Sequence, residues 1–164
     1  MQPSRIEPAP GQESVWDYPR PPALVPDHRR VRIELAGITI ADTTRALRVL
    51  ETSHPPAFYL PLADVRRDLL RAANGSSFCE WKGAASYVDV VVGIHVASEA
   101  GWFYPDASER YAALADHVAF YAGRVDRCTV GGEVVEPQAG GFYGGWITRE
   151  VVGPFKGSPG THWW

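Results

Sequence analysis

Alternation of apolar and polar residues marks the start of a regular domain near Val31. Residues 31–35, VRIEL, place apolar side chains at every second position, which is the period of a half-buried strand. Ala36-Gly37 supplies a tight turn, and residues 38–40 continue the alternation on a second strand. The pattern predicts a β-hairpin over residues 31–40.

Two later segments have helical spacing instead. Residues 42–50 offer capping side chains at 42–44 and an apolar face at Ala46, Leu47 and Leu50, which predicts a short helix ending before Pro55-Pro56. Residues 61–74 carry apolar side chains at helical spacing up to Asn74-Gly75 and predict a second helix. One or two helical turns are expected over residues 108–116.

The clearest strand in the pattern covers residues 87–96. Val88, Val90 and the apolar residues at 92, 94 and 96 fall on one face, which we expect in the core. The other face is semi-polar and is expected to meet solvent or a pocket. Further strands are predicted at 58–60, 117–121 and 127–130, with a hairpin turn at Gly131-Gly132.

These elements predict a single α+β domain dominated by antiparallel strands, with a bent or barrel-like sheet and two or three short helices. We divide the chain into a Pro-rich N-terminal extension (1–30), a β-rich core (31–136) and a C-terminal extension (137–164) rich in Gly, Pro and aromatic residues. The last segment cannot build a core of its own. We expect it either to wrap the domain with its aromatic side chains docked or to reach a partner.

Charge and composition narrow the class of protein. The net charge is −3, and Lys and Arg form only short pairs. This argues against a protein that binds nucleic acid through its phosphate backbone. Apolar runs such as 90–92 are far too short for a membrane span, and the polar start lacks a signal-peptide core. Two cysteines do not make a secreted disulfide framework. We therefore expect a cytoplasmic protein with no membrane partner and free thiols.

Residues 78–87, FCEWKGAASY, concentrate the chemistry of the chain. Burying such a polar cluster is costly unless its groups are paired, so it indicates either a site or a well-satisfied polar core. Cys79 is a reactive thiolate beside Lys82 in the first case and a small buried hydrophobe in the second. Lys82 with Gly83 either holds an anion or pairs with an internal acid, Glu51 or Asp64. Tyr87 belongs to the same cluster.

Other candidates lie apart in sequence. Glu51 is a candidate general base or charge partner for Lys82, and Asp64 suits a helix-dipole role better than a catalytic one. Tyr59 and Trp102 are expected to line the same pocket, although aromatic residues more often fill cores. Arg20 is either an anion clamp or a surface salt bridge.

The sequence contains little that indicates a metal-binding or cofactor-binding site. The five histidines and two cysteines show no close-spaced ligand pair, so no metal is predicted. No Walker loop or GxGxxG motif occurs, and residues 153–160, GPFKGSPG, lack the expected following helix. We predict no cofactor.

Five motifs in order resemble one family. They are VRIELAGITIADTTRALRVLET (31–52), FYLPLADV (58–65), CEWKGAASY (79–87), GWFYPD (101–106) and HVAFYAGRVD (117–126). The chain is thereby identified as a member of the domain-of-unknown-function 427 family, also called nucleotidyltransferase-like family 9, over about residues 31–136. The resemblance implies a small, mainly antiparallel β domain. It implies no known reaction, and its label alone suggests nucleotidyl transfer.

Three functional hypotheses follow from these residues. The leading one is a small-molecule-binding domain for an anionic ligand, with a pocket around Cys79, Lys82 and Tyr87. The second is an enzyme in the same pocket, using thiol chemistry at Cys79 or a group transfer with Glu51 as base. The third is a homodimeric interaction module that uses the C-terminal segment.

Overall fold

The computed structural model describes residues 3–164 and is mostly β, with 46% of residues in strands and 12% in helical segments. This corrects the predicted α+β class with two or three helices. One eight-residue 3₁₀ segment, η4 (Glu109–Asp116), is accompanied by isolated 3₁₀ turns: η1 (Val15–Asp17), η2 (Leu62–Asp64), η3 (Arg67–Leu69) and η5 (Ala122–Arg124). The two largest sheets are antiparallel and none of the sheets is closed, so the barrel-like form of the predicted bent or barrel-like sheet is also wrong.

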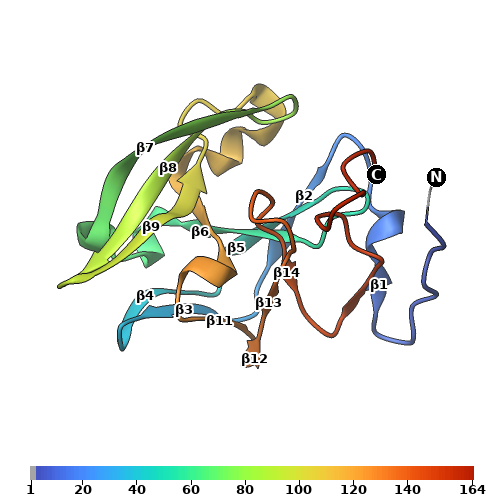
Figure 1. Ribbon diagram of the computed structural model, residues 1–164, viewed down its shortest axis with the longest axis horizontal. Coiled ribbons are helices and arrows are strands. Elements are labelled where there is room, and N and C mark those ends of the chain that lie inside the picture. Colours follow the sequence, from blue (N-terminus) through green and yellow to red (C-terminus); the bar gives the residue numbers. More distant parts are fainter. Residues whose placement is uncertain (1–2) are drawn as a thin grey trace.

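The largest sheet has seven strands in the order β2-β5-β6-β10-β9-β8-β7. Its long strands β7, β8 and β9 extend together to one side of the molecule (Figure 1). The strands are β2 (Ala23–Asp27), β5 (Ala46–Leu50), β6 (Ala57–Pro61), β7 (Leu70–Cys79), β8 (Gly83–Val92), β9 (His95–Phe103) and β10 (His117–Phe120).

A second sheet has four strands in the order β12-β11-β3-β4: β3 (Val31–Leu35), β4 (Ile38–Thr43), β11 (Arg127–Val130) and β12 (Glu133–Val134). The predicted hairpin of β3 and β4 forms with its turn at Ala36-Gly37, where both residues have positive φ. Glycine adopts such a conformation without strain. Short pairs complete the fold: β1 (Glu13–Ser14) with β15 (Val151–Val152), and β13 (Glu136–Pro137) with β14 (Trp146–Ile147).

The two large sheets pack face to face and enclose the main core. Ile33 and Ile40 of the smaller sheet meet Phe58, Val90 and Phe120 of the larger one, all essentially fully buried. The opposite face of the seven-stranded sheet carries a separate aromatic cluster, capped in part by η4. Alternate residues along each strand therefore point either into the main core or into the aromatic cluster. The candidate site lies on the side of the aromatic cluster.

Both predicted helices flanking this sheet are wrong. Residues 46–50 form β5, which pairs antiparallel with β2 on one side and β6 on the other. Pro61 ends β6, residues 62–69 form the turns η2 and η3, and β7 begins at Leu70 and pairs with β8. Strand pairing on both edges of β5, and along β7, overrides the local helical spacing in those segments.

The predicted strand over residues 87–96 is two strands. The chain turns at Gly93-Ile94, where Gly93 has a positive φ of 59°, and returns as β9. Val88 and Val90 are buried as expected, but Ile94 at the turn is 93% exposed. The alternation continued through a hairpin turn, so the pattern did not reveal the reversal.

The terminal segments pack on the sheets rather than standing apart. Trp146 is buried, stacks on Phe58 with ring centroids 5.1 Å apart, and donates its indole N–H to the Phe120 carbonyl. Tyr18 near the N-terminus is also buried. Within residues 3–164, no helix is both long and apolar enough to cross a membrane.

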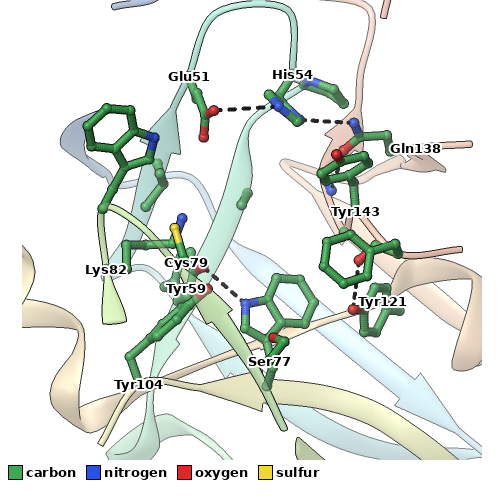
Figure 2. A pocket seen from close by; sticks show the side chains of 18 of the residues that line it. Glu51, His54, Tyr59, Ser77, Cys79, Lys82, Tyr104, Tyr121, Gln138 and Tyr143 are labelled. Atoms are coloured by element: carbon green, nitrogen blue, oxygen red, sulfur yellow. Dashed lines mark hydrogen bonds and ion pairs between the residues drawn. The ribbon is translucent and has the colours of Figure 1, made fainter. Parts of the chain in front are cut away.

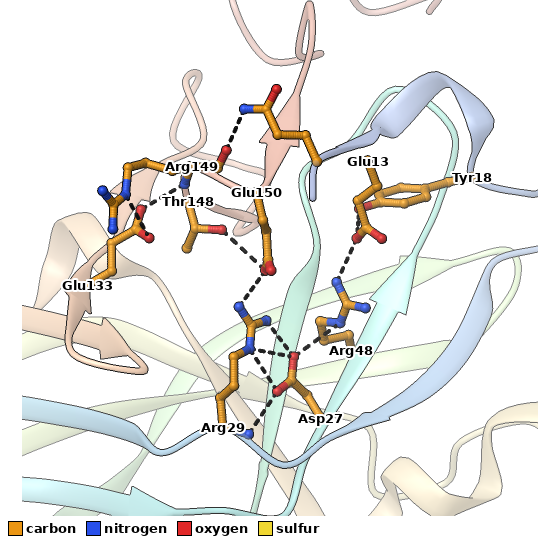
Figure 3. A network of polar contacts seen from close by, with 10 residues as sticks. Glu13, Tyr18, Asp27, Arg29, Arg48, Glu133, Thr148, Arg149 and Glu150 are labelled. Carbon is orange, nitrogen blue, oxygen red and sulfur yellow. Dashed lines mark hydrogen bonds and ion pairs between the residues drawn. The ribbon is translucent and has the colours of Figure 1, made fainter. Parts of the chain in front are cut away.

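A polar network joins these segments to the sheet (Figure 3). Asp27 on β2 receives hydrogen bonds from Arg29, and Arg29 also pairs with Glu150 at 2.6 Å. Arg48 on β5 lies 3.4 Å from Asp27 and 2.8 Å from Glu13. Burial acts to raise the pKa of Asp27, but the bonds and charge of Arg29 outweigh it and hold that pKa below its usual value. The carboxylate is therefore ionised and ties both ends of the chain to β2 and β5.

Candidate functional site

A cavity of about 460 Å³ opens on the aromatic face of the seven-stranded sheet. Its walls come from β5, β6 and β9, from the β7–β8 hairpin, and from the C-terminal segment 138–156. Figure 2 shows the labelled side chains arranged around this space. The volume lies within the range of about 300–1,000 Å³ typical of small-molecule sites.

Aromatic side chains form the floor of the cavity. Trp102 on β9 lies 4.6 Å from Tyr121 and 6.1 Å from Tyr59 between ring centroids, and it donates its indole N–H to the Tyr59 hydroxyl at 3.1 Å. Tyr104 continues the row, 6.3 Å from Tyr59. Burial raises the pKa of Tyr59, Tyr104 and Tyr121. These rings are therefore neutral, and their faces suit a flat apolar group.

Lys82 supplies an ammonium group to one wall. It is only 8% exposed, and its Nζ lies 5.5 Å from the centroid of the Tyr104 ring. No carboxylate among residues 3–164 lies within ion-pair distance of that nitrogen, so of the two alternatives for Lys82 the pairing with Glu51 or Asp64 does not occur. The side-chain nitrogens sealed from solvent without a hydrogen bond are Arg32 Nε and Arg48 Nε. Lys82 Nζ is not sealed in this way and faces the cavity.

The β7–β8 hairpin holds Lys82 in place. Cys79 and Gly83 form its last strand pair, and Gly83 has a φ of 106°, a conformation that suits glycine. Ser108 fixes the turn from outside, because its backbone N–H donates to the Lys82 carbonyl and its hydroxyl donates to the Trp81 carbonyl. The turn is therefore anchored through its main chain, and the Lys82 side chain is directed to the cavity wall.

A polar row of Glu51, His54 and Gln138 forms another wall (Figure 2). His54 Nε2 lies 3.6 Å from Glu51, and His54 Nδ1 lies 3.2 Å from the Gln138 amide nitrogen. Burial, reinforced by the positive charges of Lys156, Arg20 and Lys82, lowers the pKa of His54 from 6.5 to about 3. His54 is therefore neutral at physiological pH.

The C-terminal segment closes the remaining side. A Cβ at Gly144 would overlap the Trp102 indole, so the backbone lies directly on the ring only because the residue is glycine. Gln138 is fixed by the Gly145 N–H, which donates to its Oε1 at 3.0 Å. Lys156 lies with Nζ 5.3 Å from the Tyr143 ring and donates to the Trp164 backbone oxygen at 3.3 Å.

Most sequence-predicted site residues lie around this one cavity. Its lining includes Cys79, Glu51, Lys82, Tyr87, Tyr59 and Trp102. Arg20 does not line it but lies 3.7 Å from Glu51. Asp64 does not line the cavity. It lies in the 3₁₀ turn η2, and its carboxylate is hydrogen-bonded to Arg45 and Thr43. The described residues contain no group of three potential metal ligands.

Sequence reasoning missed His54, Gln138, Tyr121, Tyr143 and Lys156. Of these residues, only Lys156 stands out in the sequence, because the chain has just two lysines. Both of them line the cavity. Gln138 comes from a Gly-rich segment, and its 84-residue separation from His54 leaves no local pattern to read.

Comparison with known protein families identifies the family of the β-rich part of the chain. A family model described as "Domain of unknown function (DUF427)" matches residues 23–131. The chain belongs to this family. No curated protein matches it. The range matched by the DUF427 model runs from β2 to the first residue of the β11–β12 turn and includes Glu51, His54 and Lys82, whereas Gln138 and Lys156 lie beyond it. The cavity thus combines DUF427 residues with a C-terminal wall outside the matched range.

Proposed function

We propose that this DUF427 protein binds a small molecule carrying an anionic group, and that Lys82 contacts that group. The observation that carries the proposal is a largely buried ammonium on the wall of an open cavity, with no carboxylate of residues 3–164 within ion-pair distance. Lysine is almost never buried unless it is paired. An anionic ligand would supply the missing partner.

The rest of the cavity suits the body of such a ligand. The floor of Tyr59, Trp102 and Tyr104 offers aromatic faces, and burying flat apolar surface against them contributes about 25 cal/mol per Å². Charged and polar side chains also line the cavity, and Gln138 among them is oriented by its hydrogen bonds with Gly145 and Lys156. Aromatic surface combined with oriented polar groups is typical of a ligand site.

The test is a thermal-shift screen of small organic acids and nucleotides against the wild type, Lys82→Met and Lys156→Met. A probe at about 100 times its Kd stabilises the protein by about 2.7 kcal/mol, which raises Tm by roughly 5–10 °C. We expect acids to raise the Tm of the wild type but not that of Lys82→Met.

Lys156→Met is the matched control, because it removes the other lysine of the same cavity, whose amine already donates to the Trp164 oxygen. Its acid-dependent shift should be largely retained. The proposal fails if no acid shifts the wild type, or if Lys82→Met responds as the wild type does.

A second candidate is a thiol-dependent reaction in the same cavity. The observation that favours it is the position of Cys79, which is partly exposed and lines the cavity together with Lys82. A thiolate nucleophile needs access of this kind. Once a substrate is found, Cys79→Ser should abolish turnover while leaving Lys82-dependent binding intact. Unchanged turnover would exclude the thiol mechanism.

A further inference from the structure

We infer that the anionic ligand also carries an uncharged hydrogen-bond donor, a hydroxyl or N–H group, and that Glu51 accepts its hydrogen bond. This inference rests on the proposed binding function and specifies the class of ligand. It assigns Glu51 to ligand recognition and makes His54 and Gln138 its positioning residues.

Glu51 keeps free hydrogen-bonding capacity inside the cavity. Among residues 3–164, the basic side-chain nitrogens within ion-pair distance of its carboxylate are Arg20 Nε at 3.7 Å and His54 Nε2 at 3.6 Å. Both distances exceed that of a good hydrogen bond. An ionised carboxylate offers about four acceptor positions, and 22% of this side chain is exposed. The carboxylate is therefore available to a donor on a bound molecule.

Gln138 determines the tautomer of His54 and therefore which ring nitrogen carries the proton facing Glu51. The Gly145 N–H donates to Gln138 Oε1, which identifies the other amide atom as nitrogen, and that nitrogen donates to the Lys156 carbonyl at 2.7 Å. It is also the atom 3.2 Å from His54 Nδ1. Since an amide nitrogen has no acceptor lone pair, Nδ1 must accept and the ring proton must lie on Nε2.

A neutral imidazole with its proton on Nε2 leaves Glu51 facing a weak, distant donor rather than a second cation. Nδ1 is occupied by Gln138, so His54 has no free basic nitrogen to act as a general base. Glu51 is then the wall's available acceptor. The low pKa of His54, caused first by burial and then by Lys156, Arg20 and Lys82, agrees with the neutral state.

The charges around Glu51 favour an uncharged donor over an ammonium. Arg20 already lies beside the carboxylate, and Lys82 and Lys156 line the same cavity. A second ammonium from the ligand would meet like charge from all three. A hydroxyl or neutral N–H satisfies Glu51 without that repulsion, while the anionic group of the same ligand satisfies Lys82.

The test uses matched aromatic probes. Benzoate supplies the anion alone, the three hydroxybenzoate isomers add a donor at different spacings, and the three methoxybenzoates keep the oxygen but cannot donate. Affinities are measured by calorimetric or NMR titration on wild type, Glu51→Met, Glu51→Gln, Lys82→Met and Glu80→Met. Glu80 also lines the cavity but is exposed, so its variant controls for loss of a nearby negative charge.

At least one hydroxybenzoate should bind the wild type about tenfold more tightly than benzoate and its own methoxy analogue. Glu51→Met should erase that advantage while binding benzoate at least as well as wild type, because a negative charge has been removed. Glu51→Gln keeps an acceptor oxygen and should retain part of the advantage. Glu80→Met should retain all of it.

The inference is overturned if no hydroxy isomer exceeds its methoxy analogue, or if the advantage survives in Glu51→Met. In either case, benzoate binding that is lost in Lys82→Met leaves the proposed function standing. If wild type binds none of the probes, the inference is overturned, whereas the proposed function is decided by the screen of acids and nucleotides against wild type and Lys82→Met.

Discussion

The side-chain amide nitrogen of Gln138 lies 3.2 Å from Nδ1 of His54 and so fixes the proton of that imidazole on Nε2. The two residues are 84 positions apart, one after β5 and the other between β13 and β14. Their contact joins the C-terminal wall of the cavity to the wall that carries Glu51. The acceptor chemistry proposed for Glu51 depends on it.

The first prediction concerns this ring directly. Long-range ¹H–¹⁵N NMR of the wild type at pH 7 should show a neutral His54 with its proton on Nε2. Gln138→Met removes the donor to Nδ1 and should allow both tautomers to populate. An imidazolium, or a ring protonated on Nδ1 in the wild type, would contradict the assigned hydrogen bonds.

The second prediction is a pH dependence of stability. The pKa of His54 is about 3 in the folded protein and about 6.5 when unfolded. Below pH 6.5 the unfolded chain binds a proton that the folded protein does not, so stability falls as the pH drops toward 3. The contribution approaches roughly 1.4 kcal/mol per pH unit. Urea titrations at several pH values should show this slope, reduced in His54→Gln.

His28 provides the matched control for that slope, because its side chain is exposed. The substitution His28→Gln should leave the pH dependence of the unfolding free energy close to that of the wild type. Equal slopes in the wild type and His54→Gln would mean that His54 is not buried in its neutral form.

The third prediction uses the two thiols as probes of access to the cavity. Cys79 lines the cavity and should react with iodoacetamide in the native protein. Cys128 is buried in the main core, where burial raises its pKa to about 12, and should react only after unfolding. A saturating benzoate concentration should slow alkylation of Cys79. Mass spectrometry of each cysteine peptide measures both rates, and equal native reactivity would contradict the placement.

The fourth prediction concerns the C-terminal segment. Trp146→Ala removes a buried ring that stacks on Phe58 and leaves the Phe120 carbonyl without its donor. We expect a loss of about 3–5 kcal/mol in the free energy of unfolding. Trp163 is 65% exposed, and Trp163→Ala should change that energy by no more than about 0.5 kcal/mol. Similar losses in chemical denaturation would show that Trp146 does not anchor the segment.

The sequence predicted the parts of the fold whose pattern is local. The hairpin of β3 and β4 follows from alternation and an Ala-Gly turn, and both features lie within a few residues of each other. The errors within 42–50 and at 70–74 arise because apolar residues at helical spacing also fit strands that pair with neighbours, here β5 and β7. Residues 62–69 form the 3₁₀ turns η2 and η3 instead of a continuous helix. Local spacing does not reveal which neighbouring strands are available for pairing, and that pairing decides between helix and strand.

The same distinction holds for the candidate site. Cys79, Lys82 and Tyr87 lie within one hairpin, so their proximity could be inferred from sequence. Gln138 and Lys156 reach the cavity because parts of the C-terminal segment, residues 138, 142–145 and 156, line its wall. Asp64 was one of two acids considered as a partner for Lys82, but its carboxylate is bonded to Arg45 and Thr43 beside β4.

The central claim is that the Lys82 amine binds the anionic group of a ligand in the open cavity. The signal of this amine can be observed with little overlap. Because Lys82 and Lys156 are the only lysines of the chain, selective ¹⁵N-lysine labelling gives two side-chain amine signals, which Lys156→Met assigns. Titration with benzoate should shift the Lys82 signal to saturation, with a much smaller change at Lys156. A Lys82 signal that does not move, or that moves no more than that of Lys156, would contradict the account.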